Sequence, residues 1–140
     1  MKPTYCKFYS EPIDFGHALG YAYEALVNGR YKFDAVAAWT KLSERVSQGI
    51  YMGEGLLLPH TRISQLPAPL MTFAVAPQGF TGVSVPGHET ARFMCLLLSP
   101  LESAMVHTQA ISEVAKLLLD KDWASRALAC TDDAQVAALF

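Results

Sequence analysis

The sequence of 140 residues lacks the features that mark a secreted, membrane-spanning or nucleic-acid-binding chain. Its three cysteines, Cys6, Cys95 and Cys130, are widely separated and lack CxxC spacing, which favours reduced cytosolic thiols over a disulfide framework or a zinc site. The eleven basic and thirteen acidic residues form no run of one sign, so a nucleic-acid partner is not expected. The longest apolar stretch, Phe93 to Leu98, is too short to cross a bilayer, and the N-terminus has no apolar signal segment. We therefore expect a cytoplasmic protein without membrane insertion.

Several catalytic motifs are also missing. The chain has no G-x-S-x-G nucleophile elbow and no G-x-x-x-x-G-K-[ST] phosphate loop, and Gly53-Glu54-Gly55 is too short to serve as either. No carboxylate stands at ligand spacing beside His60 or His107, so we predict no metal site.

Apolar residues make up 51% of the sequence, and the formal net charge is −2. These values are typical of one ordinary domain with its own core, and we find no linker, internal repeat or low-complexity tract. We therefore expect residues 1–140 to form a single domain.

Two amphipathic helices are predicted near the N-terminus. Asp14 can cap the first, which runs to about Asn28, where Gly29 would supply a left-handed stop. Asp34 can cap the second, which ends before Gln48-Gly49. Their apolar positions at helical spacing are Phe15, Leu19, Ala22 and Leu26 in the first helix, and Ala35, Trp39, Leu42 and Val46 in the second.

Strands are predicted in the middle of the chain. Leu56 to Leu58 would form a strand that runs into a loop, Leu70 to Ala76 a buried strand, and Thr81 to Val85 a short one. Ala91 to Leu98 is continuously apolar, as strands are when both faces of a sheet are covered.

Helices are predicted again for the C-terminal part. Ser99 as N-cap, Pro100 in the first turn and Glu102 closing a capping box would begin a helix that reaches about Asp120. Two shorter helices follow, with Thr131 as the cap between them, over Asp122 to Ala129 and Asp132 to Leu139. The order of elements predicts one α/β domain, with a mixed, mostly parallel sheet of about four to five strands covered by helices on both faces.

Among the four histidines, His60 is the first candidate for chemistry. It follows Pro59 at the end of a buried strand, where α/β proteins place reactive loops. Thr61 and Arg62 after it supply a hydroxyl and a guanidinium that could bind a phosphate or carboxylate. The alternative is an exposed loop histidine beside a surface arginine.

His107 is the second candidate. It lies on the apolar stripe of the predicted long helix, so it faces the sheet, and the alternative is a histidine at the edge of the core. If the strand before that helix lies parallel to the strand ending at Leu58, His60 and His107 come to the same rim. His17 and His88 fall on a polar helix stripe and in a Gly-Pro loop, where we expect both to be exposed.

The run from Gly53 to Arg62, GEGLLLPHTR, resembles the G-x-G-apolar-P-H-x-R signature of the type-2 (fructose, mannitol and nitrogen-regulatory) IIA proteins of the bacterial phosphotransferase system. Two helices precede the motif, and a Leu-Leu-Leu-Ser-Pro strand end leads into a helix that carries His107, where family members commonly have a second active-site histidine. The resemblance covers roughly residues 13 to 138.

This resemblance implies a phosphoryl carrier of carbohydrate uptake. His60 would accept a phosphoryl group from the phosphocarrier HPr and pass it to a IIB component, with no cofactor. His107 would donate a hydrogen bond to the phosphoryl oxygens, and we add Thr61 and Arg62 as further phosphate-binding groups because they are adjacent in sequence. The sugar is not encoded in a protein that touches only the phosphoryl group.

One departure from the family pattern concerns an upstream arginine. Many members have an Arg-Glu dipeptide where an ungapped alignment on Pro59-His60 places Glu44, with Arg45 one residue later. Either a one-residue shift in the loop at 47–49 brings the Arg45 guanidinium to the site, or the protein lacks one electrostatic support. The second alternative leaves room for a regulatory adaptor whose partner binding is switched by phosphorylation of His60. A third possibility is a small-molecule binding protein without transfer chemistry.

Overall fold

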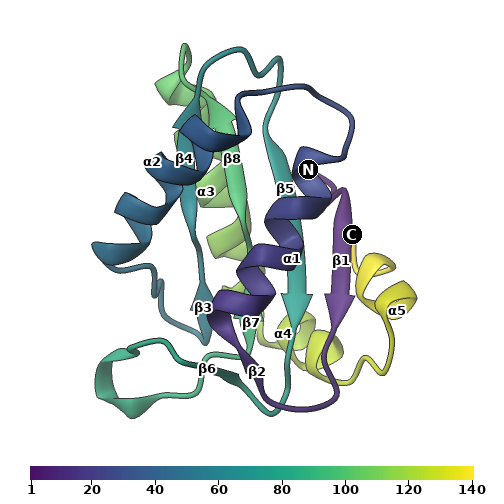
Figure 1. Ribbon diagram of the computed structural model, residues 1–140. Coiled ribbons are helices and arrows are strands. Elements are labelled where there is room, and N and C mark those ends of the chain that lie inside the picture. The colour runs from purple at the N-terminus through teal and green to yellow at the C-terminus, as the bar shows by residue number, and fades with distance from the viewer.

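A curled, mixed β-sheet with helices on both faces forms the fold (Figure 1). The computed structural model describes residues 1–140. In chain order the elements are β1 (Tyr5–Phe8), β2 (Ile13–Asp14), α1 (Phe15–Val27), α2 (Ala35–Ser47), β3 (Leu56–Leu57), β4 (His60–Ile63), β5 (Leu70–Val75), β6 (Phe80–Thr81), a 3-10 turn (Pro86–His88), β7 (Phe93–Met94), β8 (Leu97–Pro100), α3 (Ala104–Leu119), α4 (Lys121–Leu128) and α5 (Asp133–Ala137). No helix combines the length and the apolar character needed to cross a membrane.

The sheet contains two interrupted strands that lie side by side. β3 pairs parallel with β7, and β4 pairs parallel with β8. Hydrogen bonds from Cys95 N to Leu57 O (2.9 Å) and from Leu97 N to Pro59 O (3.0 Å) join the two ladders across the interruption. β5 runs antiparallel to β7 and β8 on one side and parallel to β1 on the other. The predicted mixed, mostly parallel sheet is therefore confirmed.

Helices cover both faces of this sheet, also as predicted. Side chains alternate along β8, so Leu98 packs into the core under α1 and α2, and Leu97 packs into the core under α3 and α4. Figure 1 shows α1 and α2 in front of the sheet, α3 and α4 behind it, and α5 beside β1 at its edge.

The predicted helix starts near the N-terminus are confirmed. Asp14 accepts from His17 N and caps α1, and Asp34 accepts from Ala37 N and caps α2. The left-handed stop at Gly29 is wrong, because α1 ends with Asn28 N donating to Glu24 O and Gly29 has no positive φ. On α2, Trp39 is 37% exposed, while its neighbour Ala38 enters the core.

The largest error of the sequence prediction lies between β7 and α3. Ser99 and Pro100 belong to β8, and α3 is capped by Ser103, whose Oγ accepts from Val106 N. Pro100 is tolerated in this strand because its position needs no N–H donor. The N–H groups of Leu97 and Leu101 donate toward β4, so residue 100 faces the opposite side, where β5 has not yet begun. A capping sequence was thus overridden by an available partner strand. The predicted strand Ala91 to Leu98 is accordingly split into β7 and β8.

Smaller differences concern short elements. The strand expected at Thr81 to Val85 is Phe80–Thr81 instead, and Asp132 rather than Thr131 caps the last helix. The sequence analysis missed β1 and β2, whose half-buried residues pair with β5 and β6 only through long-range contacts.

Candidate functional site

His60 begins β4 immediately after the break in the edge strand. Its side chain is buried, with 7% of the residue exposed, so the expected loop position and the exposed alternative are both wrong. Pro59 explains the break, because it has no N–H to continue the parallel ladder with β7 and β8. The interruption places the imidazole at the point where β4 starts.

The backbone fixes the orientation of this ring. On the outer edge of β3, Leu58 N donates to Ile50 O at 2.8 Å, and the Leu58 carbonyl is then met by His60 Nδ1 at 2.6 Å. A carbonyl can only accept, so Nδ1 carries the proton and Nε2 carries the lone pair of the neutral ring. Nε2 is therefore the nucleophilic nitrogen.

Arg45 comes to this nitrogen from α2. Its Nε–H donates to His60 Nε2 at 3.3 Å, and its Nη1 donates to Gln48 Oε1 at 3.2 Å. The fully buried Leu42 on the same helix anchors α2 against the sheet. The sequence left open whether Arg45 replaces the upstream arginine of the family or the site lacks such a group. In the structure the Arg45 guanidinium reaches the site.

His107 reaches the same rim from α3. The parallel pairing of β4 with β8 carries the chain to α3 beside His60, and the centroids of the two imidazoles are 5.5 Å apart with 37° between the ring planes. The sequence left open whether the two histidines meet, and in the structure they do. His107 Nδ1 is buried without a hydrogen-bond partner, which leaves Nε2 as the nitrogen able to meet a bound group.

Both imidazoles are held in the neutral form. Burial lowers the pKa of His60, the Leu58 carbonyl opposes this by favouring the protonated ring, and the Arg45 cation lowers the pKa further. Burial also lowers the pKa of His107. Repulsion from His60 when that ring is protonated, and from the Arg62 and Arg45 cations, lowers it further. At neutral pH the rings therefore offer lone pairs and N–H donors rather than fixed charge.

A shallow pocket of about 340 Å³ opens over the two rings. Besides both histidines it is lined by Arg45, Thr61 and Arg62, the three predicted phosphate-binding residues, and by Lys41 and Leu101. Three cationic side chains and no carboxylate line it, so the pocket suits a multiply charged anion such as a phosphoryl group.

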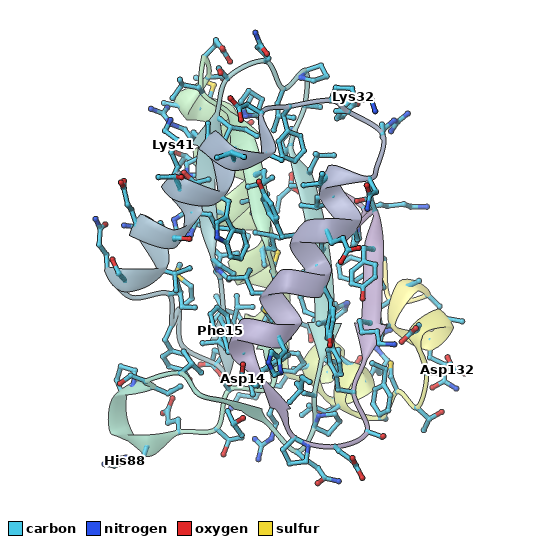
Figure 2. All side chains as sticks on the ribbon, in the orientation of Figure 1. Asp14, Phe15, Lys32, Lys41, His88 and Asp132 are labelled. Carbon is cyan, nitrogen blue, oxygen red and sulfur yellow. The ribbon has the colours of Figure 1, made fainter.

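The sequence analysis missed Lys41 and Leu101 as lining residues. Lys41 lies one helical turn before Arg45 on α2, and its Nζ donates to Arg62 O at 3.2 Å. That i, i+4 relation was the available signal, since neighbouring turns of one helix share a face. Figure 2 shows Lys41 on α2, and His88 at the tip of a loop at the other end of the molecule.

The other two histidines lie outside this pocket, and both are exposed as predicted. His17 stands 4.0 Å from the Asp14 carboxylate at the start of α1. No group of three or more His, Cys, Asp or Glu side chains is gathered as a metal site anywhere in the chain.

Comparison with known proteins finds one family model that covers most of the chain. Residues 14–140 match the family model described as "Phosphoenolpyruvate-dependent sugar phosphotransferase system, EIIA 2". No curated protein sequence matches the chain.

Solved structures share the fold at low sequence identity. The nitrogen regulatory protein IIA-Ntr from Neisseria meningitidis is 17% identical, with a TM-score of 0.76 over 92% of this chain and 88% of its own. The IIA mannitol protein from Escherichia coli is 20% identical, with a TM-score of 0.71 over 94% of each chain. The mannitol-specific cryptic enzyme IIA from Escherichia coli is 19% identical, with a TM-score of 0.65 over 94% of this chain and 88% of its own.

Proposed function

Since the chain belongs to the EIIA type-2 family of the phosphoenolpyruvate-dependent sugar phosphotransferase system, a family of phosphoryl carriers, we propose that His60 Nε2 is its phosphoryl acceptor. The group would come from phosphorylated HPr and pass to a IIB component in the cytoplasm, in support of carbohydrate uptake. The observation that carries the proposal is the hydrogen bond between His60 Nδ1 and the Leu58 carbonyl, which leaves Nε2 as the only basic nitrogen of the ring.

The transfer needs no cofactor. The Nε2 lone pair attacks the phosphorus of the donor phosphohistidine, a new P–N bond forms, and the old P–N bond breaks with its electron pair returning to the donor ring. The Nδ1 proton stays on His60, shared with Leu58 O. Transfer to the acceptor repeats the step in reverse, with the acceptor nucleophile attacking and Nε2 leaving with its pair.

Arg45 prepares the nitrogen for this step. In the free protein its Nε–H occupies the direction in which the phosphorus must approach Nε2. When the phosphoryl group arrives, the guanidinium can move its hydrogen bonds to the phosphoryl oxygens, as a charge-assisted and bidentate donor. The site therefore exchanges one weak contact for stronger ones as the loose transition state develops.

The remaining groups stabilise the charge on the oxygens. Arg62 and Lys41 add positive charge at the pocket, and Thr61 adds a hydroxyl donor. His107 lies beside His60, and its neutral ring can donate through Nε2 when that nitrogen carries the proton.

Reconstituted phosphorylation tests the proposal. Phosphoenolpyruvate, enzyme I and HPr are incubated with the protein, and the intact mass is read at neutral pH. We expect one acid-labile phosphate on the wild type and none on the His60→Ala variant. His88→Ala, which removes an exposed histidine at the other end of the molecule, is the matched control and should label like the wild type.

Two results would contradict the proposal. Retention of the phosphate by a folded His60→Ala variant would assign the acceptor elsewhere. An unlabelled wild type would exclude the carrier function and leave the regulatory adaptor as the function to test. In labelled protein, nitrogen NMR of the phosphohistidine distinguishes Nε2 from Nδ1.

A further inference from the structure

Two buried polar side-chain atoms in the chain have no hydrogen-bond partner, Ser99 Oγ and His107 Nδ1. Ser99 is 0% exposed, so its hydroxyl has lost water entirely. A buried polar atom without a partner is costly, and most buried polar groups in folded proteins are paired. Two such atoms on neighbouring elements call for a common explanation.

The fold places both atoms in the layer between the sheet and α3. Along β8, Leu97 belongs to the core under α3, and side chains alternate, so Ser99 points to that same face. His107 lies three residues before Ala110 and seven before Val114, both of which pack against the sheet from α3.

The chain reversal brings the end of β8 and the start of α3 together. β8 ends at Pro100, α3 begins at Ala104, and the helix runs back over the strand it follows. Ser99 is the penultimate residue of β8, and His107 lies in the first turn of α3. Both therefore flank the same tight connection, and Ser99 is the cross-strand partner of Arg62, which lines the pocket with His107.

The two unpaired atoms are chemically complementary. A serine hydroxyl has a proton to donate, and Nδ1 of a neutral imidazole accepts one when the ring proton is on Nε2. His107 Nε2 is the nitrogen left to meet a bound group. With its proton on Nε2, the ring donates to a phosphoryl oxygen, whereas with its proton on Nδ1 it would present a lone pair to that oxygen and repel it.

We propose that Ser99 is a positioning residue whose hydroxyl donates to His107 Nδ1 and holds that ring in the Nε2–H form needed to bind the phosphoryl group on His60. This inference rests on the proposed function for its consequence in transfer. A hydrogen bond between the two residues would satisfy both unpaired atoms at once.

The tautomer of His107 gives a direct test. Nitrogen NMR of the unphosphorylated protein at pH 7.5 reports which ring nitrogen carries the proton. We expect His107 to be predominantly Nε2–H in the wild type and to gain Nδ1–H in Ser99→Ala. His60 serves as an internal control, because its own proton is fixed by Leu58 O and should stay on Nδ1 in both proteins.

A matched pair of variants separates the hydroxyl from packing. Ser99→Thr keeps the hydroxyl. Ser99→Val places a side chain of nearly the same shape as threonine at this position, without the hydroxyl. We expect the threonine variant to keep the wild-type tautomer and the valine variant to lose it. Phosphate uptake from HPr should be about three- to tenfold slower in Ser99→Ala than in the wild type, and in Ser99→Val than in Ser99→Thr. This is the effect of losing one ordinary hydrogen bond.

The proposal is overturned if His107 carries its proton on Nδ1 in the wild type, or if Ser99→Ala leaves the tautomer unchanged. Equal tautomer populations in the threonine and valine variants would overturn it as well. The tautomer measurement needs no phosphoryl transfer, so these results are distinguishable from failure of the proposed function. A wild type that shows the Ser99-dependent tautomer but accepts no phosphate would remove the carrier function alone.

Discussion

The contact between Arg45 and His60 affects both the pKa of the imidazole and the nitrogen proposed to accept the phosphoryl group. The guanidinium donates to Nε2 before any phosphoryl group arrives, and it also helps to keep the ring neutral by lowering the pKa of His60. One side chain therefore favours the nucleophilic form of the ring and supplies a donor for the charge that transfer brings in.

Replacing Arg45 with alanine tests both effects. We expect Arg45→Ala to slow phosphate uptake about 10- to 100-fold, the range for losing a hydrogen bond to a charged group. We also expect NMR titration to show a higher pKa for His60, because a nearby cation is gone. Arg126→Ala removes an arginine whose ion pair with Asp122 lies on the exposed surface of α4, and it should change neither quantity. An unchanged uptake rate in Arg45→Ala would remove Arg45 from the mechanism.

The buried His60 and the half-buried His107 also predict how stability depends on pH. Both pKa values are lowered in the folded state, so between those values and the ordinary value of about 6.5 the unfolded chain binds more protons than the folded one. The free energy of unfolding should therefore fall as the pH drops below about 6.5. Urea unfolding at pH values from 7.5 to 5 measures this. A double variant, His60→Gln with His107→Gln, should flatten the dependence in this window, and an equal slope in both proteins would contradict the assignment.

Among the elements, the interrupted strands decide where the site forms. Pro59 divides β3 from β4, and the carbonyl of Leu58 left at the edge orients His60. The connection from β8 to α3 then returns His107 over the same point. A local sequence pattern predicted the helix one turn too early, because Ser99 and Pro100 could join β4 instead. Pairing with a neighbouring strand outweighed the propensity of a capping sequence.

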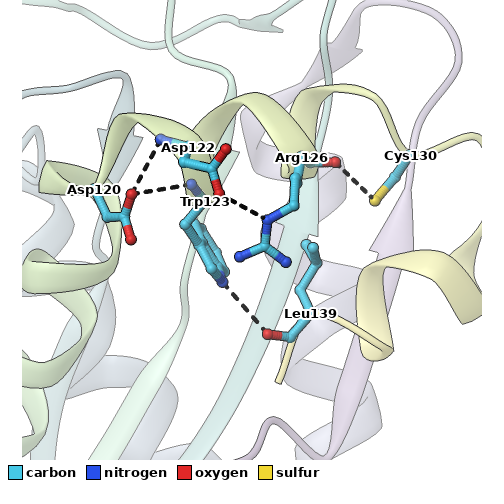
Figure 3. Close-up of polar contacts among 6 residues, drawn as sticks. All are labelled: Asp120, Asp122, Trp123, Arg126, Cys130 and Leu139. Carbon is cyan, nitrogen blue, oxygen red and sulfur yellow. Dashed lines mark hydrogen bonds and ion pairs between the residues drawn. The ribbon is translucent and has the colours of Figure 1, made fainter.

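The junction of α3 and α4 offers a test of capping at Asp120. The Asp120 carboxylate accepts from Asp122 N at 3.0 Å and Trp123 N at 3.2 Å, as Figure 3 shows, while its own N–H donates to Leu117 O at the end of α3. We expect Asp120→Ala to lower the free energy of unfolding by about 1 kcal/mol, measured in urea.

Asp122→Ala is the control for this substitution. The side chain of Asp122 takes part only in an exposed ion pair with Arg126 at 3.4 Å, and such pairs add little to stability. Alanine at this position keeps the backbone N–H that donates to Asp120. Its removal should cost about 0.5 kcal/mol or less, and equal losses from the two aspartates would show that the cap is not the source of the effect.

In the whole molecule, the sheet separates two apolar cores. The larger lies under α1 and α2, and the other lies under α3 and α4 and includes Phe73 of β5. The Phe73 ring is fully buried, with its centroid 5.5 Å from that of Trp123 and 5.3 Å from that of Phe140. These contacts pack α4 and the C-terminus against β5, in the same core that α3 joins through Ala110 and Val114.

Truncation of this ring should destabilise the fold strongly. We expect Phe73→Ala to lower the free energy of unfolding by about 3 to 5 kcal/mol, because it removes buried apolar surface and leaves a cavity. Leu119→Ala, at the 66% exposed end of α3, should cost about 0.5 kcal/mol or less. Chemical denaturation monitored by tryptophan fluorescence measures both, and a small loss at Phe73 would mean that this core is loosely packed.

The sequence alone determined much of this protein, because the signals involved are local. Apolar spacing and capping aspartates identified α1 and α2, and β-branched and aromatic residues at the centre of Leu70 to Ala76 identified β5. The motif from Gly53 to Arg62 singled out His60. The resemblance of that motif and its surroundings to a known family added His107 as the second candidate residue. Each of these depends on residues a few positions apart, where propensity, capping and side-chain periodicity act.

The tertiary structure alone decided the features that depend on distant partners. It set β1 and β2, the extension of β8 through Ser99 and Pro100, and the approach of Lys41 and Arg45 from α2 to His60. It also left Ser99 Oγ and His107 Nδ1 unpaired in the same layer. Strand pairing and side-chain burial are set by segments far apart in the chain, so no local pattern contains them.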